Sequence, residues 1–310
     1  STELTQTCIV PTLDTPLPEG KNAIWCASFL AMWQEVAPEI KAAVAGMPEV
    51  AEFTATLDAA PDPRPHIEPA NLLTAAGWVH NGIIDQIAND FAARFPSREL
   101  PDFSEVPANG YLAFAWLEAN IPFTKPYYQN DEPMVFTSST GQQTELSSFG
   151  ITREQDGAAR HVRQQVKILH YVEDKNNSGM VHNPDGPREC IVDLDGDSEP
   201  NQVLLAMVDK EPSLSALLAK IDECLSANNT PDEFGPNDIL LVPDMVWQIS
   251  HHFGELEQHP LIIAAQDIDF RLDRNGAELR SGARVVFQCG PARYLFNKPF
   301  LLVMKKRNAK

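Results

Sequence analysis

The stretch that decides the fold is IDFRLDRNGAELRSGARVVFQCGPARYLFNKPFLLVM, residues 268–304. Side chains on an extended strand point alternately to its two faces, and this stretch alternates from Gly276 onward. One face is mostly apolar and consists of Ala277, Leu279, Ser281, Ala283, Val285 and Phe287. The other face consists of Glu278, Arg280, Gly282, Arg284 and Val286. The pattern predicts a strand able to enter a sheet, and it favours a binding protein built around a large β-sheet.

Further strand patterns surround this stretch. Runs rich in apolar and β-branched residues predict strands in the last third, at 239–242, 245–249, 262–272, 283–287 and 300–305. Shorter strand patterns precede them at 133–136, 144–150, 164–171 and 191–194. The run from Asn109 to Glu118 is almost continuously apolar. It predicts a central strand that is covered on both faces.

Helical patterns lie mostly in the first third of the chain. The apolar run from Asn22 through Trp33 predicts a short strand that leads into a buried helix. Residues 70–95 have the period of one or two amphipathic helices, and Ser213 is a suitable cap for a helix at 213–225. Residues 1–21 read as irregular and the proline-rich segment 61–69 as an extended loop. Helices first and strands later predict an α+β fold, with 1–310 as a single domain.

Charge and cysteine content limit the partners. The 310 residues carry a net charge of −19, which repels phosphate backbones and anionic lipid and favours a cationic peptide or protein segment as partner. We therefore expect neither nucleic acid nor membrane as a partner. Five widely spaced cysteines suggest neither a disulfide framework nor a zinc pattern. A cytoplasmic location is expected, and secretion after removal of a signal peptide stays open.

Side chains that carry chemistry are scattered. Asp193, Asp195 and Asp197 have the spacing that begins a calcium loop, but later loop positions lack the required glycine and glutamate, so a solvated loop is predicted. His161 and His170 have no cysteine or carboxylate at ligand spacing. No nucleophile elbow or phosphate-binding loop is present. We predict no catalytic residue, no metal site and no cofactor.

Three blocks near the C-terminus resemble the serpins, protease inhibitors that trap a protease by inserting a cleaved loop into their main sheet. The blocks are Leu240 to Met245, Ile268 to Glu278, and Phe296 to Met304, in the serpin order. Weaker likeness extends upstream to about Asn22. The resemblance implies a large central mixed or antiparallel sheet, helices packed at one end and a second, smaller sheet.

This chain also departs from the serpin pattern. A serpin's Ser-Pro at the sheet opening corresponds here to Cys26-Ala27, and the asparagine of its central strand corresponds to Phe114. Polar residues that let a serpin sheet open are thus largely absent, and the segment between Pro243 and Asp267 is short. The likeness implies a reduced and divergent member of that family.

The resemblance assigns the hinge and insertion strand to Gly276, Ala277, Glu278, Leu279, Ser281, Ala283, Val285 and Phe287. If the loop is protease bait, its scissile bond lies near Gln288-Cys289, with Arg284 or Arg293 as choices for a trypsin-like protease. Leu279 and Arg280 replace small hinge residues, and a bulky leucine slows entry between packed strands. The alternative is that the segment is permanently a strand or lies over the sheet.

These observations favour a protein that is not an enzyme. The leading hypothesis is a non-inhibitory, serpin-like protein that binds an extended peptide or protein segment, such as a precursor peptide destined for partner enzymes. The alternatives are an active serpin-type inhibitor of a protease, and an enzyme whose convergent site cannot be seen in one sequence.

Overall fold

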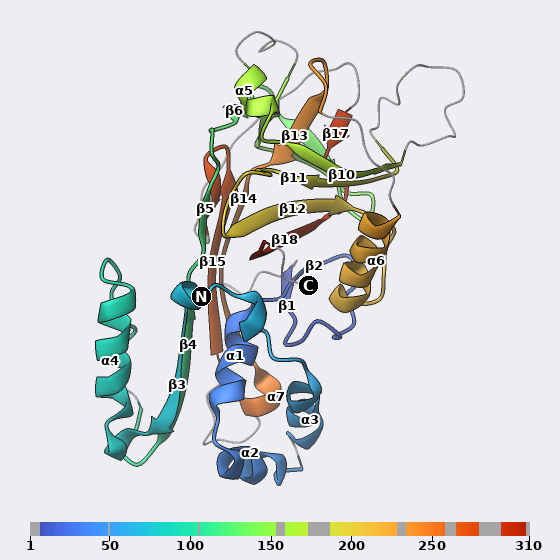
Figure 1. Cartoon of the computed structure of the whole chain (residues 1–310). Helices are drawn as coiled ribbons and strands as arrows, with labels where there is room; N and C mark the ends of the chain where they lie inside the picture. The colour runs from blue at the N-terminus through green and yellow to red at the C-terminus, as the bar shows by residue number, and fades with distance from the viewer. Residues whose placement is uncertain are drawn as a thin grey trace.

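A computed structural model describes residues 7–48, 50–104, 106–152, 159–172, 187–227, 234–257, 265–278 and 293–307. Within these ranges the strands form three four-stranded and three two-stranded sheets, and helices pack around them (Figure 1). The predicted α+β class is confirmed.

The three larger sheets are named here by their longest or central strands. The β15 sheet has the order β14 (Met245–His252), β15 (Ala265–Asp273), β16 (Gly276–Glu278) and β5 (Asn120–Pro122). The β12 sheet has the order β10 (Lys167–Val172), β11 (Glu189–Asp193), β12 (Asn201–Met207) and β18 (Leu301–Lys306). The β13 sheet has the order β17 (Arg293–Leu295), β13 (Ile239–Pro243), β9 (Ser148–Ile151) and β6 (Tyr128–Gln129).

The smaller sheets are strand pairs: β1 (Thr7–Ile9) with β2 (Asn22–Ile24), β3 (Leu72–Trp78) with β4 (Tyr111–Leu117), and β7 (Met134–Thr137) with β8 (Gln143–Leu146). The helices are α1 (Ala27–Glu35), α2 (Pro38–Ala45), α3 (Ala51–Ala59), α4 (Ile83–Arg94), α5 (Arg160–Arg163), α6 (Leu214–Ser226) and α7 (Gly254–Glu257). Three short 3₁₀ turns are η1 (Arg64–His66), η2 (Pro69–Asn71) and η3 (Val79–Asn81).

One apolar core joins the three larger sheets to α1. Its members include the fully buried Tyr127, Phe149 and Phe296, each of which stabilises the fold by about 1.5–3 kcal/mol through burial. Helices α1, α2, α3 and α7 gather at one end of the molecule (Figure 1). Among the residues that the structure describes, no helix is long and apolar enough to cross a membrane.

Several predicted elements are confirmed. Strand β2 leads into the buried helix α1, as the apolar run after Asn22 predicts. Helix α6 begins after Ser213, whose hydroxyl accepts a hydrogen bond from the Ala216 amide at 3.2 Å. The predicted irregular segment 1–21 was wrong in one place, since β1 lies within it and pairs in parallel with β2. Three residues flanked by proline and threonine are too few to show a strand period.

The prediction of helix for the whole of residues 70–95 was wrong in its first half. Leu72 to Trp78 forms β3, while α4 covers only the second half. Leucine, alanine and glycine in this run suit either state, and pairing with β4 along its whole length decides for a strand.

Strand β4 contacts apolar side chains on both faces, but all of its residues are only half-buried, so the predicted cover is partial. Leu112, Phe114 and Trp116 contact the apolar clusters around α4, whereas Tyr111 and Ala113 contact the main core beside α1. In the described residues, however, β4 pairs only with β3 and belongs to a two-stranded ribbon. The described sheets therefore leave one edge of β4 open, and this edge bears on function.

Candidate functional site

The site is defined by two strand edges, one on β4 and one on β15, that lack a strand partner in the described residues. Strand β15 pairs along its whole length with β14 on one side. On its other side it pairs with β16 at Arg271 to Asp273 only. Within the described ranges, no strand pairs with that side of β15 before Arg271. In Figure 1 the chain runs on from β4 into β5, which pairs with β16 beside β15.

Backbone hydrogen bonds establish which residues of β4 face the open edge. Val79 donates to the Gly110 carbonyl and Glu118 donates to the Asn71 carbonyl, both at 2.9 Å. Because hydrogen-bonded pairs alternate in an antiparallel ladder, the even-numbered residues of β4 point their N–H and C=O groups to β3. The odd-numbered residues, Tyr111, Ala113, Ala115 and Leu117, point theirs to the open side. These groups form a template for an added strand.

Strand β16 occupies one end of the space between the two edges. It is antiparallel to both β15 and β5. Gly276 has φ 151°, and a Cβ there would lie 2.4 Å from the Ile121 carbonyl oxygen and 2.7 Å from the Pro122 Cα. Only glycine fits so close to β5. Ala277 is completely buried. A strand added in line with β16 would form antiparallel ladders on both sides.

Helix α1 packs against both β15 and the β3–β4 ribbon and is hydrogen-bonded to each. Near its N-terminus, the Gln266 side chain of β15 donates to the Ser28 hydroxyl at 2.7 Å and to the Cys26 carbonyl at 3.2 Å. At its C-terminal end, Thr74 of β3 donates to the Glu35 carboxylate at 3.3 Å. The position of β15 relative to the β3–β4 ribbon therefore depends on contacts that both make with α1.

Sequence reasoning missed Gln266 as a site residue. Ile268, Phe270 and Leu272 are buried on the inward face of β15, and Gln266 is buried on the same face. A glutamine at a position where the strand pattern predicts an apolar residue indicates a buried amide, and a buried amide needs hydrogen-bond partners. The prediction that polar residues at the sheet opening are largely missing thus overlooked this amide.

Replacing Gln266 with alanine is expected to lower the free energy of unfolding by about 1–3 kcal/mol, since the substitution removes a buried amide and leaves the half-buried Cys26 carbonyl and Ser28 hydroxyl without this donor. Urea denaturation measures the change. Gln248→Ala is the matched control, because Gln248 is an exposed residue of the neighbouring strand β14, and less than about 0.5 kcal/mol is expected there. Equal losses in the two variants would contradict a specific role for Gln266.

The predicted hinge is only partly within the described residues. Gly276, Ala277 and Glu278 form β16 and are already paired within the β15 sheet. Arg293, one choice for the scissile site, begins β17, which pairs in parallel with β13. The remaining predicted positions lie outside the described residues: Leu279, Ser281, Ala283, Arg284, Val285, Phe287, Gln288 and Cys289.

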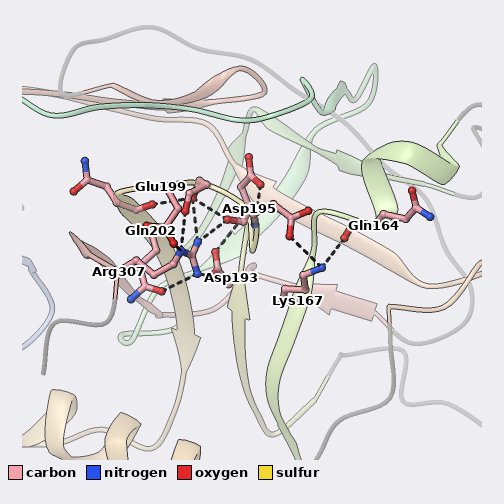
Figure 2. Close-up of polar contacts among 10 residues, drawn as sticks. Gln164, Lys167, Asp193, Asp195, Glu199, Gln202 and Arg307 are labelled. Atoms are coloured by element: carbon pink, nitrogen blue, oxygen red, sulfur yellow. Dashed lines mark hydrogen bonds and ion pairs between the residues drawn. The ribbon is translucent and has the colours of Figure 1, made fainter.

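The aspartates at the end of β11 and directly after it are not a solvated loop, which corrects that prediction. Asp193 and Asp195 are buried, and the Arg307 guanidinium donates to the Asp193 carboxylate and the Asp195 carbonyl, both at 2.8 Å (Figure 2). The Thr124 amide donates to the Asp195 carboxylate. Protein donors thus take up the oxygens that a cation would need.

Basic residues gather at the C-terminus, at Lys305, Lys306, Arg307 and Lys310, and two of them are paired with carboxylates. Arg307 also donates to the Ser198 carbonyl at 2.7 Å, and its guanidinium lies 3.7 Å from the Glu199 carboxylate (Figure 2). Lys306 lies 3.0 Å from the Glu68 carboxylate. Lys310 lies outside the described residues.

The buried thiol of Cys190 is not a nucleophile at neutral pH. Burial raises its pKa to about 12, so the thiol keeps its proton. Its neighbours in the main core are apolar. Cys190 is therefore a packing residue.

Comparison with known proteins points in one direction. No protein-family model and no curated protein matches the chain. Among solved structures, Serpin48 of the insect Tenebrio molitor matches with 11% identity and a TM-score of 0.39, over 74% of this chain and 62% of that one. The chain is similar to serpins. This likeness is the one that its sequence blocks predicted.

Other structures with the same likeness have different ligands. Native protease nexin-1 with heparin matches with 9% identity and a TM-score of 0.44, over 89% of this chain and 84% of that one. Thyroxine-binding globulin in complex with thyroxine matches with 10% identity and a TM-score of 0.41, over 74% of this chain and 61% of that one. The chain thus spans about three fifths of the length of two of these serpin-like structures.

Proposed function

We propose that this serpin-like chain is a binding protein without catalytic activity, and that it takes up an extended peptide or protein segment as a strand between β4 and β15. The observation that carries the proposal is the pair of open edges. Within the described residues, the odd-numbered positions of β4 and the part of β15 before Arg271 each lack a strand partner on one side, and β16 already pairs with both β15 and β5. Main-chain hydrogen bonds would supply affinity, as in other cases of strand addition.

The surroundings of the edges favour a particular kind of segment. Side chains that point inward would meet α1 and the apolar core, where Ala277 is already completely buried, so small or branched apolar residues fit there. Side chains that point outward would meet a protein of net charge −19, which favours lysine and arginine. We therefore expect alternating apolar and cationic residues, as a precursor peptide presented to partner enzymes can offer.

The test uses the whole chain and an eight-residue peptide that alternates valine and lysine. Calorimetry is expected to show saturable binding, and hydrogen exchange is expected to show new protection in β4 and in β15 before Arg271, but not in β12. A peptide with proline in place of each valine is the control, because proline donates no main-chain hydrogen bond. Absence of saturable binding, or protection elsewhere, would overturn the proposal.

Ala115→Pro is expected to weaken binding of this peptide at least about tenfold, or about 1.4 kcal/mol. Proline removes an N–H that points to the open side, and an edge strand tolerates it there. Ala115→Ser keeps the N–H and is the matched control, with unchanged affinity expected. Circular dichroism verifies that both variants are folded, and equal affinities would exclude strand addition along β4.

The active-inhibitor alternative predicts a different outcome for the same protein. Incubation with trypsin would then yield a complex that survives SDS, and cleavage of the loop would raise the unfolding temperature. We expect neither result, since the hinge residues Gly276 to Glu278 are already paired with β5 and β15. Formation of an SDS-stable complex would contradict the peptide-binding proposal and show that the protein is a protease inhibitor.

A further inference from the structure

A second group of side chains lies away from the strand edges, between the β12 sheet and α6. His170 comes from β10, Glu189 from β11 and Cys224 from α6. One nitrogen, oxygen or sulfur atom of each lies within 4.8 Å of those of the other two. All three residues are buried, with exposed fractions of 3%, 7% and 6%. The sequence has no cysteine or carboxylate at ligand spacing from His170, but the fold supplies both from distant parts of the chain.

His170 lacks the hydrogen bonds that a buried imidazole normally has. Neither its Nδ1 nor its Nε2 has a hydrogen-bond partner in the described structure, although Nε2 lies 3.5 Å from a Glu189 carboxylate oxygen. That separation suits an ion pair but lacks hydrogen-bond geometry. Buried polar groups without partners are uncommon, and a bound ion is one accepted explanation for them.

The strand register places His170 and Glu189 on one face of the sheet. His170 pairs with Ile191, and Glu189 pairs with Val172, so the two side chains are diagonal neighbours. Helix α6 covers this face through Ile221 and Cys224. Cys190, next to Glu189, points to the main core on the opposite face. The three ligands thus converge because two strands and one helix meet there.

The charged neighbours leave one carboxylate oxygen for a cation. Arg188 lies 3.3 Å from Oε1 of Glu189 and 2.7 Å from Asp209. Oε2 is the oxygen on the side of His170. Lys220 of α6 lies 3.3 Å from the Glu223 carboxylate. Arg188 is therefore placed to orient Glu189, as second-shell groups do for carboxylate ligands.

We propose that His170, Glu189 and Cys224 bind a divalent transition metal, with zinc as the preferred ion. One imidazole nitrogen, one carboxylate oxygen and one thiolate sulfur are a ligand set that zinc accepts, with a water molecule as the fourth ligand. Binding releases the thiol proton of Cys224 to solvent, because only the thiolate ligates. The ion would tie α6 to β10 and β11, independently of the peptide site.

Titration of the chelator-treated whole chain with Zn²⁺ tests the proposal. One equivalent is expected to bind with a dissociation constant in the micromolar range or below, and excess zinc is expected to raise the unfolding temperature. Co²⁺ in place of zinc is expected to give a thiolate-to-metal charge-transfer absorption. Failure to bind one equivalent of either metal would overturn the proposal.

Variants assign the ligands. Cys224→Ala and Glu189→Gln are each expected to weaken zinc binding at least about 100-fold, and Cys224→Ala is expected to abolish the cobalt absorption. Cys190→Ala is the matched control, because its thiol lies on the other face, and less than about threefold change is expected. If Cys224→Ala does not fold, Glu189→Gln and the control still decide. Equal affinity in all variants would mean adventitious metal only and would refute the site.

Discussion

Replacing Arg307 with alanine is expected to lower the free energy of unfolding by about 3–5 kcal/mol, the usual cost of removing one partner of a buried ion pair. Asp193 is 2% exposed, and Arg307 is its ion-pair partner at 2.8 Å. Without the guanidinium, the carboxylate would be buried with its charge uncompensated. Urea denaturation at pH 7 measures the loss.

Lys306→Ala is the matched control, since Lys306 precedes Arg307 and pairs with Glu68 near the surface. A change of at most about 1 kcal/mol is expected for this pair. Adding Asp193→Asn to Arg307→Ala is expected to recover part of the loss, because the buried charge is removed. A loss in Arg307→Ala no larger than that in Lys306→Ala would show that the buried pair does not stabilise the fold.

The loss in Arg307→Ala is also expected to depend on pH. Burial raises the pKa of Asp193 above its usual value even in the presence of Arg307, which lowers it. An acid with a raised pKa in the folded state binds its proton more tightly there than in the unfolded chain, so stability falls as pH rises between the two pKa values. Removing Arg307 raises the folded-state pKa of Asp193 further and so widens the interval between its folded and unfolded pKa values. The difference between variant and parent should therefore be larger at pH 7 than near pH 4.

Replacing Gly276 with alanine is expected to cost about 1–3 kcal/mol from backbone strain alone, because φ 151° suits glycine. The contact of the new Cβ with the Ile121 carbonyl and Pro122 adds to this cost. We expect β16 to separate from β5, which hydrogen exchange would detect as faster exchange at Ala277 and Ile121. Denaturation measures the total.

Asn275→Ala is the control for Gly276→Ala. Asn275 is exposed, and its contacts to Asp273 and Phe123 are made by its backbone. A change within about 0.5 kcal/mol is expected. If Gly276→Ala is as stable as this control, the close approach of β16 to β5 does not constrain the hinge.

Periodicity alone was sufficient for elements whose apolar pattern is unambiguous. Three elements were predictable: the buried helix after Asn22, the helix capped by Ser213 and strand β13. In each case the apolar residues fit only one of two periods, that of a helix or that of a strand. The apolar residues of Leu72 to Trp78 fit both the helical and the strand period, and only the pairing of this stretch with β4 makes it a strand. Pairing over a long sequence separation is not encoded in local pattern.

The candidate sites show the same limit. The resemblance marks Gly276 as a hinge because its motif is contiguous in sequence, and that role stays a prediction. The ion pair between Asp193 and Arg307 was not predictable, because the two residues are far apart in the sequence. In the sequence alone, one belongs to an acidic loop and the other to a basic tail. His170, Glu189 and Cys224 are separated in the same way and have no ligand spacing. Only the topology of the β12 sheet and α6 brings them together.

The ribbon of β3 and β4 has an energetic consequence for access to the open edges. With α4 it encloses two apolar clusters, around Phe91 and Ile87, that are distinct from the main core. Units of this kind open subglobally, at a lower free energy than the unfolding of the whole molecule. For the ribbon and α4 to open in this way, the contacts of Tyr111 and Ala113 with the main core and the hydrogen bond between Thr74 and Glu35 must break. An incoming strand would then be captured by conformational selection from molecules that have already opened.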